Sequence, residues 1–95
     1  MYENGDKIHR GLVTLFIEQR LLSIGKPIYD KVVEELKKKY HCYLPDCYDH
    51  PEYLRNVLYD LFGDSSRNIV ESIIRDMGEF KGTKKIADFI DILRQ

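Results

Sequence analysis

The apolar residues of this chain recur at helical spacing along almost its whole length. Ile28, Val32, Leu36 and Tyr40, for example, follow one another at intervals of four residues, which places them on one face of an α-helix. No stretch shows the sustained alternation of apolar and polar residues that is typical of a half-buried β-strand. Because the connections between apolar segments are short, the sequence predicts an all-α fold, a compact five-helix bundle.

Proline, glycine and capping residues predict where the helices begin and end. Gly25 and Pro27 separate the first helix from the second, and Gly63 supplies a C-terminal turn for the third. Asp6 and Thr83 are candidate N-caps for the first and last helices. The predicted helices cover residues 6–23, 27–40, 50–62, 65–77 and 84–94 of a single domain, residues 1–95.

Length and charge restrict the possible functions. The 95 residues, 43% of them hydrophobic, suffice for one core. The net charge of -1 excludes the strongly basic surface of a general nucleic-acid binder. Residues 1–6 are polar, and the most apolar stretch, 11–25, is interrupted by Glu18, Gln19 and Arg20. We therefore expect no secretory signal, no membrane span, a cytoplasmic location and reduced cysteines.

The first predicted helix differs from the others because it has two apolar faces. One face carries Ile8, Leu12, Leu15, Phe16 and Leu22, and the other carries Val13, Ile17, Leu21 and Ile24. Two apolar faces need two partners, so either this helix is central in the bundle or one face binds another chain. We assign Val13, Ile17 and Leu21 to contact with a protein partner or with a second copy in a homodimer.

Both cysteines and two of the three histidines lie in residues 41–50. Cys42, Cys47 and His50 have a spacing that three zinc ligands tolerate. A fourth ligand is harder to find, because His41 adjoins Cys42 and would point elsewhere, so His9 or an aspartate would have to come from outside the segment. The alternative is that both cysteines are small core residues, which we favour, with no metal and no cofactor. A Cys47 nucleophile would need a base and an oxyanion site at bonding distance, and we expect no enzyme.

Tyrosine is frequent in the middle third of the chain. A tyrosine ring buries apolar area while its hydroxyl can stay wet, which suits a binding surface. We assign Tyr43, Tyr48 and Tyr53 to partner binding. Stacking on single-stranded nucleic acid is possible but not favoured, because Asp49 and Glu52, which also resemble a capping box, oppose a phosphate backbone.

The two helices around Gly63 can also be interpreted as a helix-turn-helix. Arg67, Asn68, Ser72 and Arg75 would then face a DNA groove. A bulky tyrosine four residues before the glycine and two acidic residues on the second helix oppose this interpretation. A DNA-binding regulator is therefore an alternative, as is a zinc-stabilised helical domain.

Several short motifs resemble those of a known family. They are Leu21-Leu22-Ser23-Ile24-Gly25, His50-Pro51-Glu52-Tyr53-Leu54, Leu61-Phe62-Gly63 and Ile69-Val70-Glu71-Ser72-Ile73-Ile74. Over residues 20–77 the chain resembles the archaeal Nitrosopumilus output domain family, although Asp64-Ser65 stands where that family has a small pair such as Gly-Ala. The resemblance implies a small helical domain with a regulatory role and no active site. We therefore expect a non-catalytic regulatory or protein-interaction domain.

Overall fold

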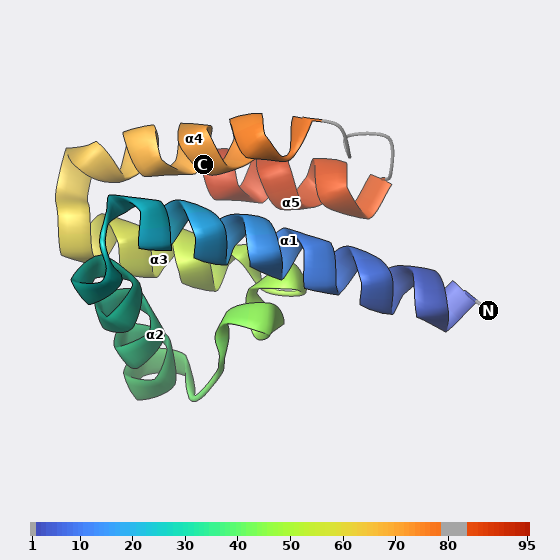
Figure 1. Ribbon diagram of the computed structural model, residues 1–95, viewed down its shortest axis with the longest axis horizontal. Coiled ribbons are helices and arrows are strands. Elements are labelled where there is room, and N and C mark those ends of the chain that lie inside the picture. Colours follow the sequence, from blue (N-terminus) through green and yellow to red (C-terminus); the bar gives the residue numbers. More distant parts are fainter. Residues whose placement is uncertain (1, 79–83) are drawn as a thin grey trace.

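Helices account for nearly all of the residues that the structure, a computed structural model, describes, namely 2–78 and 84–95 (Figure 1). The elements are α1 (Tyr2–Ile24), α2 (Lys26–Tyr40), the 3-10 segment η1 (Leu44–Tyr48), α3 (Pro51–Phe62), the 3-10 segment η2 (Gly63–Ser65), α4 (Ser66–Asp76) and α5 (Lys84–Arg94). No strand occurs within those two ranges, and the predicted all-α class is confirmed.

Most helix boundaries agree with the sequence prediction to within one residue. The start of α1 is the exception, because the helix begins at Tyr2 and Asp6 lies inside it instead of capping it. No proline precedes Asp6 that would stop the helix from extending upstream. The predicted capping box at α3 is also wrong, since His50 is the N-cap residue and no side chain caps the helix. Thr83, the predicted cap of α5, lies outside the described residues.

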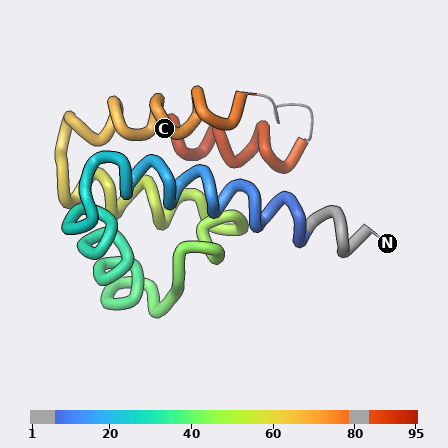
Figure 2. Tube along the Cα trace, in the orientation of Figure 1, coloured from blue at the N-terminus to red at the C-terminus, as the bar shows by residue number. Residues whose placement is uncertain are grey.

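Helix α1 sets the length of the molecule. Its 23 residues span about 34 Å at 1.5 Å per residue, close to the longest extent of 37 Å. In Figure 1 it lies on the near side, in front of α3, while α2 departs steeply from its end. Helix α1 packs against α2, η1 and α4, and α3 packs against α2, α4 and α5. The trace in Figure 2 shows α4 and α5 running in opposite directions beside each other.

One hydrophobic core joins all of these helices. Its members from α1 and α2 are Val13, Ile17, Leu21, Val32 and Leu36. The segment 42–48 and α3 add Cys42, Leu44, Cys47, Tyr48, Leu54, Val57 and Leu58. The last two helices and the residue after α4 add Val70, Ile73, Ile74, Met77, Ile86, Phe89, Ile90 and Leu93. The predicted stripe of α2 therefore does face the core, with Val32 and Leu36 buried and Ile28 and Tyr40 packed against it.

Polar side chains of α1 fix its orientation at the edge of this core. Arg20 donates two hydrogen bonds to the Asp76 carboxylate, from Nε at 3.1 Å and from Nη2 at 3.0 Å, which ties α1 to the end of α4. The Tyr29 hydroxyl donates to Glu18 Oε2 at 3.2 Å and ties α2 to α1. A two-pronged guanidinium–carboxylate bond restricts rotation as well as distance, so it fixes the helix about its own axis.

Asp49, which was expected to cap α3, instead joins three elements. Its carboxylate lies 2.7 Å from Arg10 Nη2 of α1 and 2.7 Å from Lys85 Nζ of α5. Both cations also lie over the ring of Tyr48, with Arg10 Cζ 5.4 Å and Lys85 Nζ 4.6 Å from its centroid. The two cations lower the pKa of the Asp49 carboxyl, mainly through the Lys85 hydrogen bond. A single carboxylate thus balances two cations above a buried aromatic ring.

We predict that Asp49→Asn destabilises the protein at neutral pH. Half-exposed ion pairs contribute modestly, so the expected loss is about 1 kcal/mol. Because the folded-state pKa of Asp49 is lowered, its contribution is complete above about pH 4, the usual range of a carboxyl pKa, and is lost as the pH falls through the lowered value. Urea unfolding of both proteins at neutral and strongly acidic pH measures the difference.

A matched control is Asp64→Asn, since Asp64 is exposed and has no ion pair among the described residues. We expect this variant to unfold like the wild type at both pH values. Equal losses for the two variants, or a loss at Asp49 that does not depend on pH, would contradict the assignment of Asp49 as a joint between elements.

Candidate functional site

The face of α1 that was assigned to a partner lies in the core. Val13, Ile17 and Leu21 are each no more than 2% exposed and contact the other helices. The assignment of this face to partner binding is therefore corrected, because these side chains are already buried within a single chain. Helix α1 is instead an integral part of the bundle, which was the alternative interpretation of its two apolar faces.

On the opposite face of α1, Leu12 and Phe16 are half-buried and three other large side chains are exposed, while Ile24, at the end of the core face, is 47% exposed. Ile8 is 61% exposed, Leu15 47% and Leu22 40%, although large aliphatic side chains are usually buried. Successive members are seven residues apart and drift by only about 20° around the helix per step, so they form one line. Leu15 and the buried Ile17 are separated by about 200° around the helix. We call Ile8, Leu15 and Leu22 the outer stripe of α1.

The structure does not bring together Cys42, Cys47 and His50, the ligands of the alternative zinc interpretation. Cys42 and Cys47 are buried and reduced, and no three His, Cys, Asp or Glu residues in the described ranges form a group that could hold a metal. Burial raises the pKa of both thiols, most strongly at Cys47, where Cys42 and two carboxylates add to the effect. His50 instead stacks on Tyr53, with ring centroids 4.5 Å apart. The thiols are therefore protonated core groups at neutral pH.

The three tyrosines assigned to a partner have different environments. Tyr48 is buried under its two cations. Tyr53 is partly buried between the rings of His50 and Tyr40, the latter with its centroid 4.1 Å away and nearly parallel. Tyr43 is exposed, with Lys37 over its ring. The structure therefore leaves only Tyr43 of the three broadly accessible, which corrects the assignment for Tyr48.

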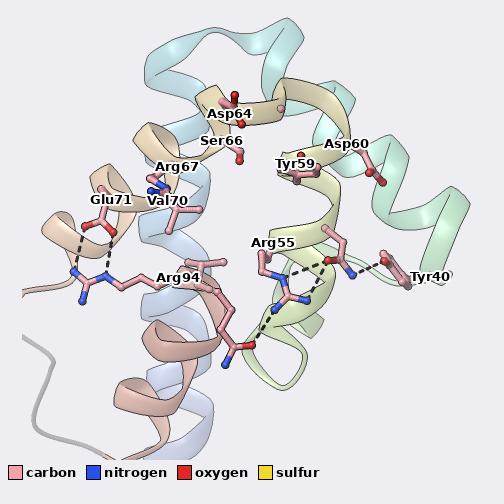
Figure 3. Close-up of a pocket in the computed structure, with 14 residues that line it drawn as sticks. Tyr40, Arg55, Tyr59, Asp60, Asp64, Ser66, Arg67, Val70, Glu71 and Arg94 are labelled. Atoms are coloured by element: carbon pink, nitrogen blue, oxygen red, sulfur yellow. Dashed lines mark hydrogen bonds and ion pairs between the residues drawn. The ribbon is translucent and has the colours of Figure 1, made fainter.

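A groove of about 930 Å³ lies where α3, α4 and the end of α5 meet (Figure 3). Three of its charged side chains, Asp60, Glu71 and Arg94, take part in ion pairs between helices. Arg94 donates from Nε and Nη2 to the Glu71 carboxylate at 3.0 and 3.2 Å, and Asp60 pairs with Lys39 of α2. These pairs hold α5 against α4 and α2 against α3, so they serve the fold.

Arg55 lies between these pairs and is held by neutral acceptors. Nε and Nη2 donate to the Asn56 side chain, and Nη1 donates to the Ile92 carbonyl and to Gln95 Oε1. Asn56 Nδ2 in turn donates to the Tyr40 hydroxyl at 3.1 Å. The guanidinium thus joins α3 to the end of α5 and to α2, with four of its five N–H groups in use. The polar side chains that line the groove therefore hold neighbouring helices together.

The residues of the helix-turn-helix interpretation lie along the surface of α4, and one of them, Arg67, also lines the groove beside α3 and α5. Arg67, Asn68 and Arg75 are exposed, while the Ser72 hydroxyl donates back to the Asn68 carbonyl at 2.9 Å. In the view of Figure 1, α4 runs back in the direction opposite to α3. DNA binding through α4 stays a prediction.

Comparison with known proteins gave no match: no family model, no curated protein and no solved structure is similar to this chain. No helix in the described ranges is long and apolar enough to cross a membrane.

Spacing in the sequence does not by itself separate the outer stripe from the core face. Ile8, Leu15 and Leu22 share their face with Leu12 and Phe16, which are half-buried and are spaced like core residues. The sequence shows both faces, but only packing shows which one the chain itself covers.

We predict that a charge at position 17 of α1 destabilises the fold much more than a charge at position 15. Ile17→Asp buries an unpaired carboxylate and should cost about 4 kcal/mol or more, comparable with the whole stability of a small domain. Leu15→Asp should cost about 1 kcal/mol or less, through helix propensity and partial burial. Thermal unfolding followed by circular dichroism measures both. A folded Ile17→Asp protein, or an unfolded Leu15→Asp protein, would contradict the assignment of the two faces.

Proposed function

We propose that this chain is a non-catalytic protein-interaction domain of regulatory type that binds its partner through the outer stripe of α1. The observation that carries the proposal is the exposure of three large aliphatic side chains in one line, on the face opposite the core. Exposed apolar patches with polar rims are typical of protein-binding surfaces. The surrounding exposed positions, Lys7 and Gln19, supply such a rim.

The shape of this surface indicates what kind of partner it fits. An apolar line with seven-residue spacing on a straight helix is the geometry by which one amphipathic helix packs along another. Ile8, Leu15 and Leu22 are all exposed along about 21 Å of α1, so a helix can approach the stripe along its length. We therefore expect the partner to present an amphipathic helix.

Two further features support a role without catalysis. Burial raises the pKa of both thiols, so neither is an activated nucleophile at neutral pH. The charged side chains of the groove between α3, α4 and α5 are largely engaged in joints between helices. A cytoplasmic, regulatory setting of the kind implied by the resemblance to the archaeal output domain family belongs to the same proposal.

Site-specific photo-cross-linking tests this function. A photoreactive amino acid in place of Leu15 should give a defined covalent adduct with one protein species in the source cell. The same amino acid in place of Tyr59, which is 58% exposed on α3, is the matched control and should give none. Adducts that are equal at the two positions, or confined to position 59, would contradict the proposal.

A further inference from the structure

We propose that the outer stripe of α1 binds the outer stripe of a second copy of this chain, with the two helices antiparallel and Leu15 on the two-fold axis. This inference rests on the proposed function, because it names the partner of the same surface. It follows from three properties of α1: the symmetry of the stripe, the charges along one edge and the glycine beside it.

The stripe is symmetric about its central residue. Ile8 precedes Leu15 by seven residues and Leu22 follows it by seven, so a two-fold axis through Leu15 places Ile8 of each copy opposite Leu22 of the other. A two-fold interface requires a surface that is complementary to itself, and this line of three aliphatic residues meets that requirement. The net charge of -1 adds little repulsion between two copies.

The charges beside the stripe favour the antiparallel arrangement. Lys7 and Glu18 lie on the same edge of the stripe, since they are eleven residues apart, close to three helical turns. In an antiparallel two-fold pair this edge meets the same edge of the partner copy. Lys7 and the partner copy's Glu18 are then about 7 Å apart along the helix axis, a gap that their side chains span. A parallel pair brings no such opposite charges together.

Gly11 lies beside the stripe, between Ile8 and Leu15. A glycine inside a helix costs about 1 kcal/mol relative to alanine. A Cβ atom at Gly11 would meet nothing within 4 Å, so no contact within the described chain requires the glycine. Gly11 and Glu18 lie on the same edge of the stripe, four residues before and three residues after Leu15, so in the antiparallel pair Gly11 faces the partner copy's Glu18. The missing side chain leaves room for that residue between the helices.

The size of the interface sets the expected affinity. The stripe is about 21 Å long, so two such faces make a small interface, at the low end of the range for specific protein–protein contacts. We therefore expect a dimer that forms at micromolar concentrations. Sedimentation equilibrium over a wide concentration range should show a reversible monomer–dimer equilibrium, which Leu15→Asp weakens at least about tenfold. The matched variant Tyr59→Asp, on another exposed surface, should leave the equilibrium unchanged.

Cysteine cross-linking tests the direction of the two helices. Leu15→Cys should form covalent dimers with a short bismaleimide, because position 15 faces itself. A mixture of Ile8→Cys and Leu22→Cys, one of them carrying a size tag, should give the mixed dimer, and each variant alone should give at least tenfold less product. The wild type controls for reaction at the buried Cys42 and Cys47, and Tyr59→Cys controls for random collision.

Three results would overturn the inference: a chain that stays monomeric throughout, a dimer that Leu15→Asp does not weaken, or efficient cross-linking of Ile8→Cys with itself. If the chain stays monomeric but position 15 cross-links to a different protein, the homodimer is contradicted and the proposed function stands. The absence of a Leu15-specific adduct to any protein, this chain included, contradicts both.

Discussion

The burial of one face of α1 is the interaction on which the rest of this structure depends. Val13, Ile17 and Leu21 form the side of the core against which α2, η1 and α4 pack. Because a helix makes one turn every 3.6 residues, burying this face turns Ile8, Leu15 and Leu22 away from the core. The same packing that folds the chain therefore creates its exposed apolar line.

Hydrogen bonds and ion pairs then fix the orientation of α1 on the core. The Arg20–Asp76 pair holds its C-terminal half against α4, and Asp49 holds its N-terminal half to η1 and α5 through Arg10 and Lys85. These joints connect residues that are far apart in the sequence, so they fix rotation as well as position. A helix that cannot rotate presents one constant face to solvent, which is a condition for specific recognition.

The sequence predicted the helices well and the surfaces poorly, for a physical reason. Gly25, Pro27 and Gly63 restrict the backbone locally, so the helix ends near them were predicted to within a residue. Asp49 was assigned to a cap because its nearest neighbours allow one, whereas its actual partners lie 39 residues upstream and 36 downstream. The two faces of α1 are both apolar in the sequence, and which one is covered depends on the packing of three other elements, α2, η1 and α4.

The central claim of this account is that the two faces of α1 have separate roles, one in folding and one in association. An NMR dilution series with labelled methyl groups tests it most directly. On concentration, the methyl resonances of Ile8, Leu15 and Leu22 should shift together, while those of Val13, Ile17 and Leu21 should stay constant. Shifts spread equally over both faces, or confined to methyl groups outside α1, would contradict the account.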